Sequence, residues 1–143
     1  GYIAGDNVAI DAIRSVASGF IFTTSLSPVI CAGALAAIKY LRSENGVALR
    51  QQHQSRANVL KSLLAINNID VIDNETHIVP VLIGDAVKCK RISDELITDH
   101  NIYVQSINYP TVEVGTERLR FAPTPLHTDA MINDLVDKLK AVL

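Results

Sequence analysis

The fold is decided by residues 78–107, which read IVPVLIGDAVKCKRISDELITDHNIYVQSI. The first six residues are apolar and predict a strand, and Pro80 favours an edge position because proline has no backbone donor. Asp85 is a candidate N-cap for a helix that we expect from residue 86 to about residue 98. Residues 102–107 predict a second strand. Strand, helix and strand in this order predict a small sheet covered by helices, in the α/β or α+β class.

The chain on either side of this segment is mainly helical in its periodicity. Helices are predicted over residues 8–17, 29–41 and 47–66, and from residue 128 toward the C-terminus. Short strands are predicted over residues 2–4, 20–22, 69–72 and 118–122. Ser27-Pro28 predicts a helix start, Gly19 a helix end, and residues 43–46 and 67–68 interruptions between helices.

The strand predicted at 118–122 carries a candidate anion site. Leu119 and Phe121 alternate with Arg118 and Arg120, so the arginines point to the face opposite the apolar pair. An arginine on that face holds a carboxylate well, through two parallel hydrogen bonds. An ordinary surface arginine has the same spacing, and spacing alone favours that simpler interpretation.

A second candidate is the hydroxyl run Thr23-Thr24-Ser25, which precedes Pro28. Hydroxyls and backbone N–H groups ahead of a helix are able to bind a phosphate group. A run of this kind is more often a loop or a helix cap, and both interpretations stay open at this point.

Cysteine and histidine are too few and too scattered for a metal site. Two cysteines make neither a disulfide framework nor a four-cysteine zinc site, and the four histidines share no ligand spacing. Cys31 stands among apolar residues and is expected to be buried. Cys89 lies between two lysines and is expected at the surface. No histidine is assigned a catalytic role.

Length and composition fit one globular domain and exclude some classes of protein. The chain has 143 residues, of which 48% are apolar, enough for a packed core. Its 13 Lys+Arg against 15 Asp+Glu give a net charge of −2, which argues against nucleic acid as the partner, since phosphate binding needs a basic surplus. No apolar run reaches the roughly 18 residues of a membrane span, so we expect no membrane insertion.

Four blocks of sequence together resemble a known family. They are residues 1–5 (GYIAG), 19–26 (GFIFTTSL), 101–112 (NIYVQSINYPTV) and 115–128 (GTERLRFAPTPLHT). In this order they resemble the C-terminal third of the 5-aminolevulinate synthases, in the α-oxoamine synthase group of fold-type-I pyridoxal 5'-phosphate (PLP) enzymes. The resemblance spans essentially the whole chain, and the last two blocks are its most specific part.

The resemblance implies a reaction and a set of binding residues. The reaction is the condensation of glycine with succinyl-CoA to 5-aminolevulinate, CoA and CO₂, the first step of tetrapyrrole and heme biosynthesis. Arg120 is implied to hold the glycine carboxylate. Thr111, on the loop 108–115, is implied to contact a substrate carboxylate when the loop closes as a lid. Thr23 and Thr24 are implied to reach the PLP phosphate of a partner subunit, in a homodimer with shared active sites.

The resemblance also implies how the chain divides. Residues 1–28 are expected to end a large PLP-binding domain, and residues 29–143 to form a small C-terminal α/β domain. The lysine that forms the Schiff base with PLP is expected upstream of Gly1, so these residues alone are expected to be inactive. Glu113-Val114 stands where the family commonly has Pro-Arg, which leaves the dynamics of the lid open.

Other functions remain to be weighed. A close alternative is another α-oxoamine synthase, such as 8-amino-7-oxononanoate synthase or 2-amino-3-ketobutyrate CoA ligase. Residues 108–111, following Tyr103-Val104-Gln105, favour 5-aminolevulinate synthase over these. A more distant alternative is a non-catalytic α/β binding module. A bacterial cytoplasmic location is favoured, with the mitochondrial matrix expected for a eukaryotic protein.

Overall fold

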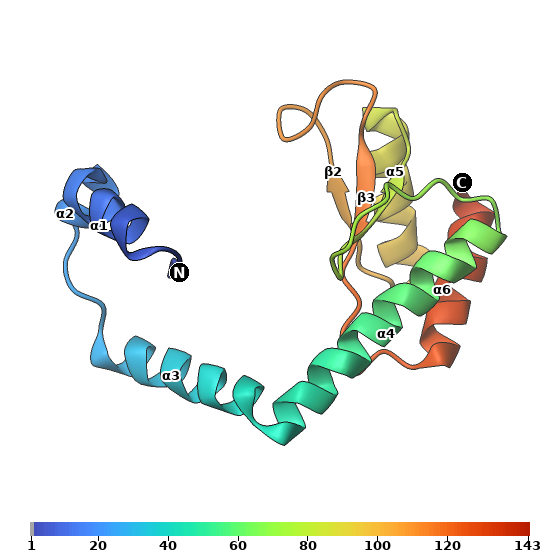
Figure 1. The fold of residues 1–143 in the computed structure, drawn as a ribbon. Coiled ribbons are helices and arrows are strands. Elements are labelled where there is room, and N and C mark those ends of the chain that lie inside the picture. The colour runs from blue at the N-terminus through green and yellow to red at the C-terminus, as the bar shows by residue number, and fades with distance from the viewer. Residues whose placement is uncertain (1) are drawn as a thin grey trace. The chain divides into compact units, whose positions relative to one another are not determined.

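The computed structural model in Figure 1 describes residues 2–143. The chain forms two compact units, Gly1–Lys39 and Tyr40–Leu143. None of the helices within residues 2–143 combines the length and apolar character needed to cross a membrane. The boundary predicted at residue 28, between two domains of a larger protein, stays a prediction.

The first unit is helical. It contains α1 (Asn7–Val16) and α2 (Ser18–Ile21), and α3 (Pro28–Arg42) begins in it. Asp6 caps α1, its carboxylate accepting the Val8 N–H at 2.9 Å. The strands predicted at 2–4 and 20–22 are wrong where the structure describes them: residues 2–4 are irregular, and α2 includes Phe20. Gly19 likewise lies inside α2, and α1 ends at its C-cap Ala17.

No residue between 2 and 39 is buried. Phe22 is 87% exposed, and Val8 and Val29 are each 79% exposed. Cys31, expected to be buried, is exposed as well. Its apolar neighbours do not enclose it because they are exposed themselves. A surface this rich in apolar side chains is typical of one that another protein surface covers.

The second unit is built on a three-stranded antiparallel sheet. Its strands are β1 (Val79–Leu82), β2 (Gln105–Ile107) and β3 (Arg118–Phe121), in the order β1-β3-β2. β3 is therefore central, although it is the last of the three along the chain (Figure 1). The predicted small sheet of the α/β or α+β class is confirmed.

Pro80 lies on an edge strand of this sheet, as predicted. The outer side of β1 meets the segment 70–72, where Val71 forms an isolated bridge with Val81 in place of the predicted strand. The Ile72 N–H donates to the Pro80 carbonyl at 2.9 Å. Pro80 has no backbone N–H to donate back to the Ile72 carbonyl. That carbonyl instead accepts from Asn74 Nδ2 at 3.0 Å. A side chain thus replaces the hydrogen bond that the proline lacks.

Three helices pack on one face of the sheet. They are α4 (Glu44–Ile66), α5 (Ala86–His100) and α6 (Asp129–Val142). The core joins apolar residues of these helices to inward-facing residues of β1 and β3. Its fully buried large side chains are Leu60, Leu64, Val79, Val81, Cys89, Ile92, Leu96, Leu119 and Leu139.

The helix caps follow the predicted chemistry. The Asp85 carboxylate accepts the Lys88 N–H at 2.7 Å, and the Thr128 hydroxyl accepts the Met131 N–H at 3.2 Å. Only Ser43 separates α3 from α4, so residues 44–46 are helical where an interruption was expected. Gly46 is buried there, and a Cβ on it would overlap the Tyr40 carbonyl.

Cys89 is buried, against expectation. It lies on the core face of α5 with Ile92 and Leu96, because the helical spacing outweighs its two charged sequence neighbours. Burial raises the pKa of its thiol above the usual 9.0; a backbone hydrogen bond from Ile107 lowers it, and the charge of Glu117 raises it further.

Candidate functional site

The central strand β3 separates core residues from site residues. Leu119 is completely buried and Phe121 is 5% exposed, whereas Arg120 is exposed. The alternation predicted from the sequence is therefore confirmed. Arg118 is half-buried and its Nε donates to the Thr116 carbonyl at 2.8 Å. The side chain of Arg120 makes no hydrogen bond or ion pair with any residue in the range 2–143, so its guanidinium is available to a ligand.

Arg120 lines a cleft of about 560 Å³ within the second unit. Gln105 and Tyr103 lie in the same wall. Gln105 is the register partner of Arg120 across β2 and β3, which brings the two side chains to the same face of the sheet. The Tyr103 hydroxyl donates to Gln105 Oε1 at 3.0 Å. Gln105 Nε2 forms no hydrogen bond with another described residue, so unpaired donors stand on two adjacent strands.

Sequence analysis missed Tyr103 and Gln105 as site residues. They precede Arg120 by more than a dozen positions, and only the antiparallel pairing of β2 with β3 brings them beside it. The available signal was the alternation of polar Tyr103 and Gln105 with apolar Val104, which is 3% exposed.

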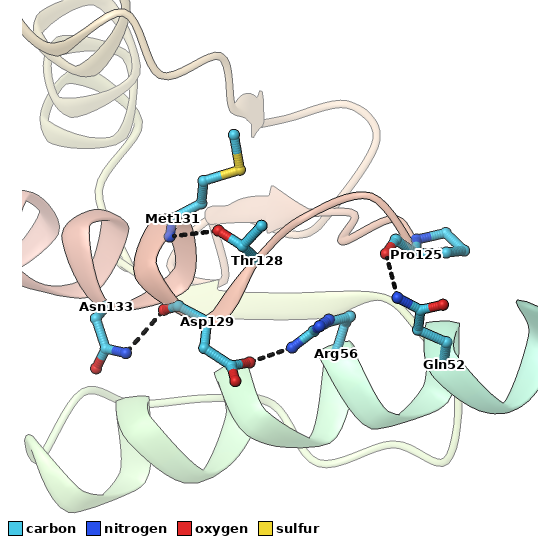
Figure 2. Close-up of polar contacts among 7 residues, drawn as sticks. All are labelled: Gln52, Arg56, Pro125, Thr128, Asp129, Met131 and Asn133. Atoms are coloured by element: carbon cyan, nitrogen blue, oxygen red, sulfur yellow. Dashed lines mark hydrogen bonds and ion pairs between the residues drawn. The ribbon is translucent and has the colours of Figure 1, made fainter.

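The segment 123–125, which follows β3, is fastened to α4. Gln52 Nε2 donates to the Pro125 carbonyl at 2.9 Å (Figure 2). His53 Nε2 lies 2.8 Å from the Pro123 carbonyl, and it carries the proton in this contact because a carbonyl only accepts. The Thr124 N–H donates to His127 Nδ1 at 3.0 Å. Pro123 and His127 line the cleft, so these bonds fix its rim.

The start of α6 is fastened to the same helix. Arg56 on α4 forms an ion pair with Asp129, the first residue of α6 (Figure 2). Asn133 Nδ2 donates to the Asp129 carbonyl at 2.7 Å. The chain from the end of β3 to the start of α6 is thus held at several points along α4, and the strand that bears Arg120 ends in a fixed support.

The other predicted site residues lie elsewhere. Thr111 is exposed on the loop between β2 and β3 and does not line the cleft of Arg120. Thr23 and Thr24 belong to the first unit, between α2 and α3, where both are exposed. Neither of their hydroxyls forms a hydrogen bond with another residue described in the structure. The assignment of Arg120, Thr111, Thr23 and Thr24 to ligands stays a prediction.

Metal binding has no candidate cluster among the residues that the structure describes. Within residues 2–143, no group of three or more His, Cys, Asp or Glu side chains is placed to hold a metal ion. The closest histidines are His53 and His77, whose ring centroids are 4.6 Å apart.

Comparison with known proteins identifies the family of this chain. Residues 1–139 match the family model of the class I and II aminotransferases. The chain belongs to this family of fold-type-I PLP enzymes.

Within this family, the chain is similar to 5-aminolevulinate synthases. The chain is 51% identical to a 5-aminolevulinate synthase from Bradyrhizobium diazoefficiens, over 99% of the chain and 34% of the relative. It is 50% identical to the mitochondrial, non-specific 5-aminolevulinate synthase of Bos taurus, over 99% of the chain and 22% of that protein. The resemblance seen in the sequence is confirmed, and the chain spans about a third or less of the length of these relatives.

Solved structures agree on the fold. A serine palmitoyltransferase from S. paucimobilis with a bound PLP–myriocin aldimine aligns with a TM-score of 0.80 and 26% identity. The alignment covers 92% of this chain and 33% of that one. A cofactor of this kind is therefore present in a structural relative.

Proposed function

We propose that this chain is part of a PLP-dependent 5-aminolevulinate synthase, which condenses glycine with succinyl-CoA and releases CoA and CO₂. The observation that carries the proposal is the exposed side chain of Arg120, free of partners among the described residues, on a strand that lines a cleft. The high identity to 5-aminolevulinate synthases over nearly the whole chain supports it.

Arg120 would bind the glycine carboxylate. A guanidinium offers parallel donors that match both carboxylate oxygens, so it orients the amino acid as well as neutralising its charge. Gln105, with its amide nitrogen free, adds a donor beside the same group. A carboxylate fixed in this way leaves the amino group and Cα of glycine pointing away from β3, which is the orientation that a reaction at Cα requires.

The residues of this chain fit the phosphate of PLP. Thr23 and Thr24 are adjacent, exposed and unbonded through their side chains, and they precede the N-terminal turn of α3. Two hydroxyls in this place would donate to phosphate oxygens. When bound, PLP supplies an electron sink that eases loss of a proton from Cα. The lysine that anchors PLP is expected outside this chain.

A homodimer with shared active sites completes the proposal. The exposed apolar side chains of the first unit would be covered in such an assembly, since apolar surface of this kind favours association. Thr111 would contact a substrate carboxylate from the loop 108–115. Relatives come from bacteria and from mitochondria, and for this protein a bacterial cytoplasmic location is proposed.

The test is substitution of Arg120 in the full-length protein. We expect Arg120→Ala to raise the KM for glycine at least tenfold, since a charge-assisted hydrogen bond contributes about 2 kcal/mol, while PLP binding stays unchanged. Arg50→Ala is the matched control, because Arg50 is exposed on α4 and its side chain forms no hydrogen bond or ion pair with another described residue. Unchanged glycine saturation in Arg120→Ala would refute the assignment.

The substrate pair decides between this and the related α-oxoamine synthases. Turnover with glycine and succinyl-CoA is expected to exceed turnover with alanine and a long-chain acyl-CoA. Faster turnover with alanine and a long-chain acyl-CoA would instead assign the protein to the related α-oxoamine synthases.

A further inference from the structure

Glu117 is the one buried charged residue within residues 2–143, with 2% of its surface exposed. Burying a carboxylate is costly unless hydrogen bonds compensate for the lost water. Nothing in the proposed reaction uses this group. Its Oε2 accepts the backbone N–H of Gly115 at 2.9 Å. The carboxylate therefore holds the residue at which the loop 108–115 ends.

The backbone around Glu117 is itself fixed. Its carbonyl accepts the N–H groups of Ile83 at 2.8 Å and Gly84 at 3.0 Å, just beyond β1. Gly115 has a φ of +86°, a conformation that favours glycine. A Cβ on Gly84 would come within 3.4 Å of the Gly115 carbonyl, so the two turns are in contact. Glu117 thus links Gly115 to a rigid edge of the sheet.

The other end of the loop is held less firmly. Asn108 Nδ2 reaches the Ala86 carbonyl at 3.4 Å, and its buried Oδ1 has no partner among the described residues. Both ends nevertheless reach the start of α5, because Asn108 bonds to the Ala86 carbonyl and the Glu117 carbonyl accepts the Gly84 N–H just before the helix. The attachment that Glu117 makes is the stronger, since its bond to the Gly115 N–H is 2.9 Å long against 3.4 Å for that of Asn108.

The part of the loop between these ends faces solvent. Tyr109 is 69% exposed and Val114 is 78% exposed. The hydrogen bonds of this part are turns within the loop, from the Thr111 N–H to the Asn108 carbonyl and from Thr116 to the Glu113 carbonyl. A segment with so few contacts to the rest of the protein moves away from it easily. The position of the loop 108–115 therefore depends on how its two ends are held.

We infer that Glu117 is a positioning residue whose buried carboxylate fixes the Gly115 hinge and so sets how the loop 108–115 presents Thr111. The consequence for catalysis rests on the proposed function, in which Thr111 contacts the substrate. The hinge itself does not depend on that function and can be measured without substrate.

The experiment compares Glu117→Ala and Glu117→Gln with Glu113→Ala in the full-length holoenzyme. Glu113 is the matched control, because it lies on the same loop, is exposed, and forms no side-chain bond with another described residue. Hydrogen exchange at the Gly115 amide reports the hinge, and the KM and kcat for glycine and for succinyl-CoA report the loop. We expect exchange at Gly115 about tenfold faster in Glu117→Ala, and about threefold faster in Glu117→Gln, whose amide oxygen is a weaker acceptor.

In Glu113→Ala, exchange at Gly115 is expected to match the unsubstituted protein. The KM for the substrate whose carboxylate Thr111 contacts, glycine or succinyl-CoA, is expected to rise about tenfold in Glu117→Ala with a smaller change in kcat, since fewer molecules hold the loop in its binding arrangement. Unchanged exchange in both Glu117 variants, or an equal rise in Glu113→Ala, overturns the inference.

Faster exchange at Gly115 with unchanged KM values for both glycine and succinyl-CoA supports the hinge and contradicts the proposed contact of Thr111 with a substrate. If Glu117→Ala does not fold, Glu117→Gln decides alone, because it keeps the shape of the side chain.

Discussion

Gln105 on β2 faces Arg120 on β3 directly across the sheet, and the hydroxyl of Tyr103 holds the Gln105 amide oxygen at 3.0 Å. The guanidinium therefore has a polar neighbour on β2 that a hydrogen bond from Tyr103 holds in place. The proposed recognition of a carboxylate rests on this pair, which neither strand would make alone.

The pair predicts graded effects on glycine binding. Gln105→Leu removes a donor beside the carboxylate and is expected to raise the KM for glycine about fivefold, corresponding to a hydrogen bond of about 1 kcal/mol. Tyr103→Phe removes the group that orients Gln105 and is expected to have a smaller effect in the same direction. Steady-state kinetics of the full-length protein measure both. An effect of Tyr103→Phe that persists in the Gln105→Leu background would show that Tyr103 does not act through Gln105.

The attachment of the segment 123–125 to α4 predicts a loss of stability. His53→Ala removes the bond to the Pro123 carbonyl and is expected to lower the free energy of unfolding by about 1 kcal/mol. Gln52→Ala, which loses a more exposed bond to Pro125, is expected to cost less. Gln54→Ala is the control, because Gln54 is exposed and its side chain bonds to no other described residue. Denaturant unfolding compares the three, and equal stability of all three would contradict the attachment.

Burial of Cys89 predicts a decline in stability at alkaline pH. Because burial raises the pKa of this thiol above 9.0, the unfolded chain releases the proton first as the pH rises. The stability linked to Cys89 is thus fully present below about pH 9 and is lost progressively above it. We expect Cys89→Ala to show a shallower fall in thermal midpoint between pH 8 and pH 10 than the unsubstituted chain. If the thermal midpoints of both proteins fall equally with pH, the Cys89 thiol does not contribute to the pH dependence of stability.

The proposed phosphate contact of Thr23 and Thr24 predicts an effect on cofactor affinity. Replacing both with valine keeps the shape and removes both hydroxyls, so PLP is expected to bind at least tenfold more weakly, with two hydrogen bonds to a charged phosphate lost. Absorbance titration of the full-length protein with PLP measures this. Mixing the double variant with Arg120→Ala is expected to restore activity in part if subunits share a site. Failure of every mixture to recover would argue against sharing.

Much of the second unit could be predicted from the sequence because its signals are local. The caps at Asp85 and Thr128 and the helix starts follow from hydrogen bonds within three residues. The alternation of Leu119 with Arg120 follows from the pleat of a strand. The edge position of Pro80 follows from its missing N–H.

The wrong predictions concern residues whose secondary structure or burial depends on more than their neighbours in the sequence. Apolar residues 20–22 resemble a strand, yet Phe20 lies in the short helix α2. The predicted burial of the two cysteines was reversed: Cys31 is exposed on α3 and Cys89 buried on α5. Charged or apolar neighbours in sequence do not set burial on a helix, since adjacent positions point in different directions.

The sequence by itself determined the main helices, the three strands of the sheet and the family, because caps, periodicity and characteristic sequence blocks are properties of neighbouring residues. Only the tertiary structure decided that Arg120 meets Gln105 and Tyr103, and that Glu117 is buried beside Gly115. Those relationships depend on the register of β2 with β3 and on the turn beyond β1. Register is set by packing of the whole sheet against its helices, which no single stretch of the chain specifies.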